Sequence, residues 1–142
     1  MFSFSELSSK ELYEIWRLRE EVFVVEQNCV YQDADGEDIY AYHLCAFRDK
    51  QLAAYCRIYR QNTEIHIGRV VIRKAFRGQK WAYTLMAKAH YHAKEVFPEC
   101  RGICISAQTY LKTFYLTLGY RVTGESYLED GIPHIPMHKV ID

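Results

Sequence analysis

The residues from Ile65 to Met86 constrain the fold more than any other stretch of this sequence. They begin with a β-branched run ending in Val70-Val71-Ile72, a pattern typical of a strand that is covered on both faces. After a short basic turn, apolar residues recur at helical spacing as far as Pro98, which forbids continuation. These residues are Trp81, Leu85, Ala89, Ala93 and Val96. A strand, turn and helix in this order place several free backbone N–H groups at the start of a helix, where they can hold an anion.

The turn itself carries the glycine and the charges that an anion site needs. A helix that starts near Gly78 would aim its N–H groups and its positive dipole end at a phosphate, and Arg77 and Lys80 would add charge. Arg73 and Lys74 are further candidates in the same turn. The alternative is an ordinary strand, turn and helix with a basic turn that is exposed to solvent.

The net charge indicates that any anion site is local. Lys and Arg together number 18, and so do Asp and Glu, so no overall field draws the chain to nucleic acid or to an anionic membrane. The length of 142 residues predicts one domain over residues 1–142, with a core that needs neither metal nor disulfide to hold it.

The five cysteines predict a reducing compartment. Their number is odd, and none belongs to a Cys-x-x-Cys pair or to a zinc-finger spacing. Cys45, Cys56 and Cys104 lie among apolar residues, where a reduced cysteine behaves as a small hydrophobe. The first residues do not form a basic and then apolar leader, and no segment reaches membrane-spanning length. We therefore expect a soluble cytoplasmic protein without a metal site.

Outside the central stretch, the pattern alternates between helical and strand periods. Ser8-Ser9-Lys10-Glu11 has the form of a capping box, which predicts a helix from about Ser9 to Val22. Strands are expected over residues 1–5, 43–47, 52–59, 65–72, 103–107, 120–123 and 134–140, and a short helix over 110–118. The order is strand, helix, three strands, helix, strand, helix and two strands.

Two segments, Val24–Tyr42 and Glu125–His134, follow neither period and are rich in acidic residues. A long loop within a compact domain is usually functional or disordered, and interleaved tyrosines favour an ordered loop in the first segment. Asp33-x-Asp35-Gly36 is faintly similar to a calcium loop, but the remaining ligand positions of that motif are absent. Arg19 and Glu20 lie near enough to the first loop to be second-choice site residues.

Two motifs resemble those of the GNAT superfamily of acetyl-CoA-dependent N-acetyltransferases. Arg77-Gly78-Gln79-Lys80-Trp81-Ala82 is similar to the family pattern Arg/Gln-x-x-Gly-x-Gly/Ala, with Lys80 where most members have glycine. The segment from Gln108 to Tyr120 is similar to Asn-x-x-Ala-x-x-Phe-Tyr-x-x-x-Gly-Phe, with Gln for Asn and Leu for Ala. The order of the expected helices and strands also resembles that of this superfamily.

Further stretches resemble the ElaA-like branch, which also accepts lysine at the position of Lys80. They are Phe23-Val24-Val25-Glu26-Gln27, Tyr31-Gln32-x-x-Asp35, Ile67-Gly68-Arg69-Val70-Val71 and Glu129-Asp130-Gly131-Ile132-Pro133-His134. The resemblance covers nearly the whole chain. It implies an α/β (α+β) GNAT fold, with a central mixed, mostly antiparallel sheet of six to seven strands that is splayed between strands four and five and flanked by helices.

The resemblance also implies where acetyl-CoA binds. The residues that would bind it are Val70, Val71, Ile72, Arg77, Gly78, Gln79, Lys80, Trp81, Ala82 and Gln108. The pantetheine arm would pair with the strand backbone around Val71, and a main-chain N–H there would polarise the thioester carbonyl. The pyrophosphate would lie on the turn, and Gln108 would hydrogen-bond the pantetheine or the substrate.

Acetyl transfer to an amine needs a neutral amine, a polarised carbonyl and a proton for the departing thiolate. Tyr115 resembles the general acid of the family, and a phenol with an ordinary pKa of about 10 suits the reprotonation of a thiolate. Glu26, His43 and His134 are the candidates for general base, because each adjoins a loop that should border the acceptor pocket. Each histidine has a structural role as its alternative. Glu26 alternatively holds the acceptor's ammonium group, and Arg69 alternatively pairs with such a carboxylate.

The sequence therefore predicts an N-acetyltransferase that transfers an acetyl group from acetyl-CoA to a primary amine by direct attack in a ternary complex. The acids of the two loops would suit a cationic acceptor, or would be solvated surface charges. These acids are Glu26, Asp33, Asp35, Asp38, Glu129 and Asp130. The alternative function is a non-catalytic acyl-CoA sensor or partner subunit. The expected partner is a small-molecule or protein amine, without nucleic acid or membrane, and a homodimer is possible through an edge strand.

Overall fold

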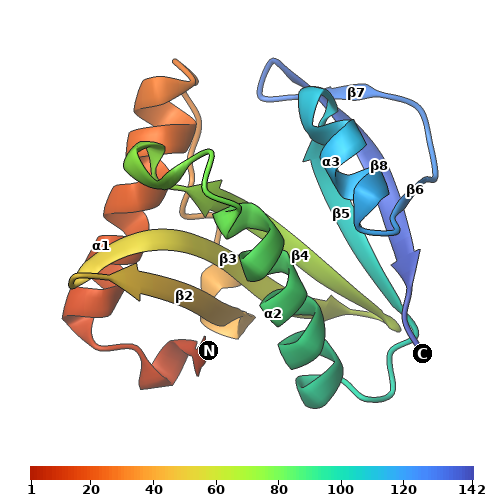
Figure 1. The fold of residues 1–142 in the computed structure, drawn as a ribbon, viewed down its shortest axis with the longest axis horizontal. Helices are drawn as coiled ribbons and strands as arrows, with labels where there is room; N and C mark the ends of the chain where they lie inside the picture. Colours follow the sequence, from red (N-terminus) through yellow and green to blue (C-terminus); the bar gives the residue numbers. More distant parts are fainter.

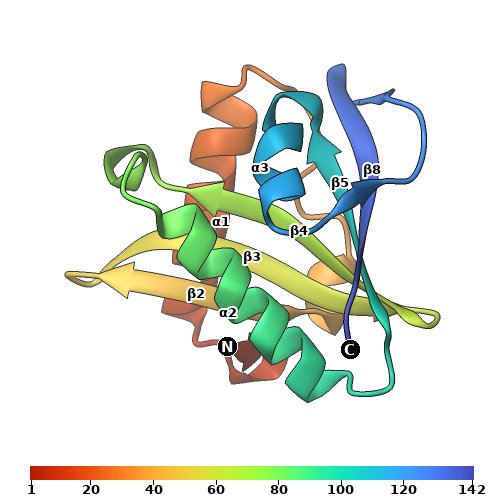
Figure 2. The same ribbon diagram turned by 45° about the vertical axis from the view of Figure 1, so that its right-hand side comes forward.

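The chain forms one twisted sheet with helices on both faces (Figures 1 and 2). The computed structural model describes all of residues 1–142. Helix α1 (Ser9–Arg19) packs on one face, where Ile15 and Leu18 are buried against Tyr55 and Val71. Helices α2 (Trp81–Val96) and α3 (Lys112–Thr117) cover the other face and enclose the larger core. The sheet is therefore the middle layer of three.

The sheet is mixed and mostly antiparallel, as the resemblance implies. Its strands are β1 (Phe2–Ser3), β2 (Tyr42–Arg48), β3 (Gln51–Gln61), β4 (Glu64–Ile72), β5 (Gly102–Gln108), β6 (Arg121–Val122), β7 (Tyr127–Glu129) and β8 (Ile132–Val140). Seven strands follow the order β1-β2-β3-β4-β5-β8-β6, and β7 pairs with β8 beside that path. Strand β7 lies in the acidic segment Glu125–His134, for which the sequence predicts a loop.

Strands β4 and β5 are the only parallel neighbours, and they pair over a short distance. The paired residues are Ile65 with Ile103 and His66 with Cys104. Beyond them β4 continues to Ile72 and β5 to Gln108 without pairing with each other, and the two strands diverge (Figure 1). The splay between the fourth and fifth strands is thus confirmed.

Two helix boundaries differ from the prediction. Helix α1 ends at Arg19, and the chain continues as a π-helix over Glu20–Glu26, which the sequence analysis had divided between the helix and a loop. Apolar spacing does not reveal where the turns widen from α to π. Helix α2 begins at Trp81 and not near Gly78, because Lys80 has a left-handed backbone conformation with φ of 63°.

The start of α1 is stabilised as its sequence predicts. The Glu11 amide donates to Ser8 Oγ at 3.1 Å, and the Ser8 amide donates to Glu11 Oε2 at 2.8 Å, which completes a capping box. Short 3₁₀ helices occur at Phe4–Glu6, Glu37–Tyr40, Lys74–Phe76 and Thr109–Leu111. All five cysteines are free. None of the helices combines the length and the apolar character needed to cross a membrane.

Candidate active site

A cavity of about 1000 Å³ lies where β4 and β5 separate. Its walls come from the π-helix, the second half of β4, the end of β5, and α3 with the 3₁₀ turn before it. Further walls come from the segment after the π-helix and from β7 with the turn that follows it. The cavity therefore connects both halves of the splayed sheet with the two acidic segments.

The free edge of β4 is the main extended feature of the cavity. Beyond His66 no strand pairs with this edge, so its backbone groups are available to an extended ligand. A β-bulge at Arg69, where φ is 51°, places Arg69 and Val70 opposite the single residue Cys56. Val70, Val71 and Ile72, which the resemblance implies for the pantetheine site, all line the cavity.

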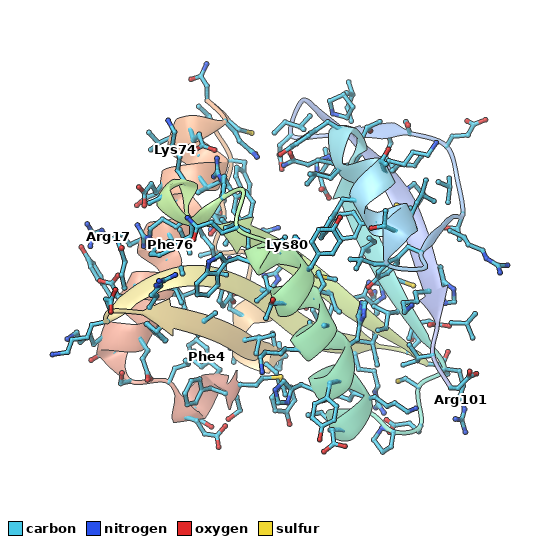
Figure 3. The ribbon with its side chains drawn as sticks, viewed as in Figure 1. Phe4, Arg17, Lys74, Phe76, Lys80 and Arg101 are labelled. Atoms are coloured by element: carbon cyan, nitrogen blue, oxygen red, sulfur yellow. The ribbon has the colours of Figure 1, made fainter.

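The turn after β4 borders a second, adjoining hollow of about 330 Å³. Gly78, Lys80 and Trp81 line only this hollow, whereas Arg77 and Ala82 line both hollows. No side chain caps the amino terminus of α2, so its first N–H groups are free for an anion. Figure 3 shows Lys80 at this end of α2. The uncapped helix and the free β4 edge together fit the phosphates and the pantetheine arm of coenzyme A.

Three other residues of the turn that the sequence proposes for the phosphate site line neither hollow; they are Arg73, Lys74 and Gln79. Arg73 is buried, donates to the Leu52 carbonyl and pairs with Glu21, so it belongs to the packing of the fold and not to a phosphate site. Lys74 lies in a 3₁₀ turn on the far side of the turn from Lys80 (Figure 3). Gln79 lines neither hollow.

Lys80 occupies a backbone conformation that favours glycine, which accounts for the usual glycine at this position of the motif. A left-handed residue with a Cβ atom costs about 1 kcal/mol relative to glycine. We expect Lys80→Gly to have a higher free energy of unfolding than Lys80→Ala by about that amount in denaturant titrations. Both variants lose the charge, so equal stabilities would contradict this account. A loss of coenzyme A affinity shared by both variants would measure the contribution of the ammonium group.

Tyr115, from α3, reaches the cavity between the two halves of the sheet. Its ring is buried against Phe114 and Tyr120, and the residue lines the cavity wall. Burial raises the pKa of Tyr115, and no hydrogen bond contributes to the shift. The phenol is therefore protonated at neutral pH and has no partner within the chain for its proton.

His134 lies on the same cavity, at the start of β8 and opposite Gln108 of β5. Its Nδ1 is 2.7 Å from the Ile132 carbonyl oxygen, and its Nε2 is 3.1 Å from Glu129 Oε2. The carbonyl oxygen only accepts, so Nδ1 carries a proton. The ring also stacks on Tyr127, which leaves the Nε2 edge toward Glu129.

Glu26 and Gln108 also line the cavity, but each has a partner. Glu26 Oε2 is 2.8 Å from Nη1 of Arg77, so a predicted catalytic residue pairs with a predicted phosphate residue. Gln108 and Gln27 exchange two amide hydrogen bonds, of 3.1 and 3.3 Å, across the splay. Gln27 also lines the cavity, although the motif that contains it gives it no role in the site.

His43, a candidate base, lies away from the cavity. It is fully buried, with Nδ1 2.6 Å from the Tyr55 hydroxyl and Nε2 2.8 Å from the Asp38 carbonyl oxygen. Burial lowers its pKa. His43 is therefore a structural histidine: the loop before it lines the cavity, but His43 itself does not.

Six charged side chains of alternating sign form a closed ring of ion pairs beside the cavity. In order around the ring they are Arg19, Asp33, Arg69, Asp35, Arg57 and Asp38, with N···O separations of 2.6 to 3.2 Å. The arginines come from α1, β4 and β3, and all three aspartates come from the segment between the π-helix and β2. This arginine–aspartate ring fastens the first acidic segment to the sheet.

The ring rules out both interpretations that the sequence allows for the three loop aspartates. Asp33, Asp35 and Asp38 are neither solvated surface charges nor free to hold an ammonium group, because each pairs with two arginines. Hydrogen bonds from Arg57 hold the pKa of Asp35 below its usual range. Burial alone would raise the pKa of Asp38, but hydrogen bonds and charge from Arg19 outweigh it and lower that pKa. Arg19, a second-choice site residue, is completely buried in the ring.

Three tyrosines that the sequence did not assign to the site also line the cavity. They are Tyr31, Tyr59 and Tyr110. Tyr31 donates to Asp33 Oδ1 at 2.7 Å, and the Arg69 guanidinium lies 5.6 Å from its ring centroid. For Tyr31, the available signal was the set of tyrosines interleaved in the first acidic segment, since they indicated that this loop is ordered.

Comparison with known proteins identifies similar chains over nearly the full length. The model of a family described as an acetyltransferase (GNAT) domain matches residues 6–141. The protein ElaA of Escherichia coli K12 is 39% identical, over 96% of this chain and 92% of its own length. The crystal structure of an acyl-CoA N-acyltransferase from Pseudomonas aeruginosa is 40% identical, covers 96% of this chain and 95% of that one, and has a TM-score of 0.91.

A more distant likeness supports the fold alone. An aminoglycoside 6'-N-acetyltransferase, solved as a complex with coenzyme A, has 14% identity and a TM-score of 0.75, with 98% of this chain and 95% of that chain covered.

Proposed function

Because the chain belongs to the GNAT acetyltransferase family, we propose that it transfers an acetyl group from acetyl-CoA to a primary amine, in the cavity between β4 and β5. Membership of the family makes the chain an acyltransferase. The observation that carries the proposal of acetyl transfer to an amine is the position of Tyr115, which lines the same cavity as the free edge of β4. We assign all of residues 1–142 to one catalytic domain.

Acetyl-CoA would bind along the splay, and a neighbour of the same fold was solved as a complex with coenzyme A. The free edge of β4 around Val70–Ile72 would pair with the pantetheine arm, and one backbone N–H would polarise the thioester carbonyl. The uncapped start of α2 would hold the pyrophosphate, with charge from Lys80 and Arg77. The ion pair between Arg77 and Glu26 would then exchange its carboxylate for a phosphate oxygen.

Transfer requires the amine nitrogen to attack the thioester carbonyl carbon and the thiolate to leave with a proton. The raised pKa of Tyr115 makes its phenol a weak acid, so the hydroxyl acts first as a hydrogen-bond donor to the developing thiolate. On the amine side, His134 and Glu26 are the remaining candidates for base, since both line the cavity. His134 would act through Nε2, the nitrogen that faces Glu129.

The acids that still face the cavity favour a cationic acceptor. With the aspartates of the ring neutralised, Glu37 and Asp130 line the cavity without a basic partner, and Glu129 contacts only His134. A diamine, or a lysine side chain beside a second cation, would keep one ammonium group near these acids while the other nitrogen reacts. We propose such a polycationic amine as the acceptor class.

A kinetic comparison of matched acceptors tests this class. We expect a higher kcat/KM for a linear diamine than for the monoamine of the same length, as measured by the release of thiol from acetyl-CoA. The Asp130→Asn substitution should raise the KM for the diamine about two- to fivefold, without changing the KM for the monoamine. Glu95→Gln, which removes an exposed acid of α2 that does not line the cavity, serves as the control. A monoamine that reacts as well as the diamine would contradict the proposed acceptor class but not the acetyl transfer.

The alternative of a non-catalytic acyl-CoA sensor has less support. A sensor needs the phosphate turn and the β4 edge, but it has no use for an unpartnered phenol in the cavity wall. The proposal keeps a cytoplasmic location, which agrees with five free cysteines.

A further inference from the structure

We propose that Glu64, Cys104 and His138 form a zinc site at the end of β4 and β5 where these two strands are paired. They come from three adjacent strands, β4, β5 and β8, and their donor atoms all lie within 4.8 Å of one another. Glu64 Oε2 is 3.2 Å from His138 Nε2. Cys104 also lines the wall of the cavity, but Glu64 and His138 do not, so the site adjoins the edge of the acetyl-transfer cavity.

The sheet register places the three ligands on one face. His138 lies directly opposite Cys104 in the antiparallel pair of β5 and β8. His66 lies beside Cys104 in the parallel pair of β4 and β5, so Glu64, two residues earlier, is on the same face. Glu64 is thereby brought level with Gly102, and its side chain crosses above that glycine to reach His138.

Gly102 supplies the space that this cluster needs. A Cβ atom at Gly102 would overlap both Glu64 Oε2 and His138 Nε2. The two ligands therefore meet in a recess that only glycine leaves open, with Cys104 beside it on the same strand. Figure 3 shows Arg101, the preceding residue, at the corner of the molecule where the paired ends of β4 and β5 lie.

The donor set favours zinc over other common cations. One thiolate, one imidazole and one carboxylate are ligands that zinc accepts together, whereas calcium and magnesium require oxygen ligands. A tetrahedral zinc ion, with bonds of about 2.0–2.3 Å, needs donor atoms about 3.3–3.8 Å apart, so small side-chain rotations would close the site. All three side chains are only partly buried, which leaves the fourth position to water.

Zinc binding here would fasten the two halves of the sheet where they are joined most weakly. Only two residue pairs connect β4 to β5: Glu64 directly precedes these pairs on β4, and Cys104 belongs to one of them. Binding would displace the thiol proton of Cys104 and form one zinc–sulfur bond, with no change in oxidation state. The prediction of a chain without a metal site rested on Cys-x-x-Cys spacing, which does not detect ligands brought together from three strands.

Metal titration of the intact, chelator-treated chain tests the site. We expect one Zn²⁺ per chain in competition with a chromophoric chelator, and we expect Co²⁺ to give the absorption of a tetrahedral thiolate complex. Cys104→Ser should abolish the thiolate-to-cobalt band, and His138→Ala should abolish stoichiometric binding. Cys45→Ser, on β2, and His92→Ala, on α2, are the matched controls and should bind as the wild type does.

A glycine substitution tests the geometry without removing a ligand. Gly102→Ala should lose zinc binding, because the added Cβ atom would push Glu64 and His138 apart. Zinc should raise the melting temperature of the wild type and of the Cys45→Ser control, but not that of Gly102→Ala or Cys104→Ser. Wild-type binding below one equivalent, or binding that survives both Cys104→Ser and His138→Ala, would overturn the proposal.

Discussion

Replacing Tyr115 with phenylalanine is expected to lower kcat for acetyl transfer by about 100-fold or more and to leave the affinity for coenzyme A unchanged. The ring of Tyr115 is buried in the core, and phenylalanine retains that packing. Only the hydroxyl is lost, and with it the hydrogen-bond donor that the cavity offers to a departing thiolate. Steady-state kinetics with a saturating amine, together with calorimetric titration of coenzyme A, measure the two effects separately.

Tyr110 provides the matched control for this substitution. It lines the same cavity from the 3₁₀ turn before α3, but its side chain is exposed. Tyr110→Phe should therefore retain a kcat close to that of the wild type. A similar loss of kcat in the two variants would show that the Tyr115 hydroxyl has no special role, as would an unchanged kcat in Tyr115→Phe.

Replacing Asp38 with asparagine is expected to lower the free energy of unfolding by about 3 kcal/mol. Asp38 accepts from Arg19 at 2.7 Å and from Arg57 at 3.1 Å, and the Arg19 side chain is completely buried. The substitution keeps the shape of the side chain but leaves the arginine–aspartate ring with one uncompensated positive charge. Urea unfolding at neutral pH measures the loss. Glu99→Gln, which breaks an exposed ion pair, should cost at most about 1 kcal/mol.

The same ring predicts how stability depends on pH. The pKa values of Asp35 and Asp38 are lowered in the folded chain, so the unfolded chain takes up protons first as the pH falls. The stabilisation is fully present above the unfolded pKa of about 4, and it is lost as the pH falls through the folded values. The urea concentration at the unfolding midpoint should decrease as the pH is lowered below about 4, and it should decrease less steeply in Asp38→Asn. Identical pH profiles for the two proteins would contradict the assignment.

The sequence was sufficient for the elements whose signals are local. The capping box at Ser8 predicted where α1 begins, and the β-branched run before Arg73 predicted β4. The end of α1 was not predictable, because a π-helix keeps apolar residues on nearly the same face while it widens the turn. The start of α2 depended on the backbone of Lys80, and a lysine gives no signal for a left-handed conformation.

The candidate site was predictable where a motif carries it, and not where distant residues meet. Tyr115 was assigned from a motif and His134 from the loop that it adjoins, and both line the cavity. The ring could not be found in this way, because the loop acids were visible but their arginine partners come from three other elements. Arg57 in particular was only one basic residue within an apolar strand. The Gln27–Gln108 pair was unpredictable for the same reason, since the two residues are 81 positions apart in the sequence.

The measurement that tests the central claim most directly is the fate of the acetyl group when wild-type chain is mixed with acetyl-CoA in the presence and absence of a diamine. Direct attack in the cavity predicts that free coenzyme A and the mono-acetylated diamine appear in equal amounts, by mass spectrometry, and only when the amine is present. Tight binding of acetyl-CoA with no acetylated amine would contradict acetyl transfer. An acetylated chain formed without amine would contradict direct attack.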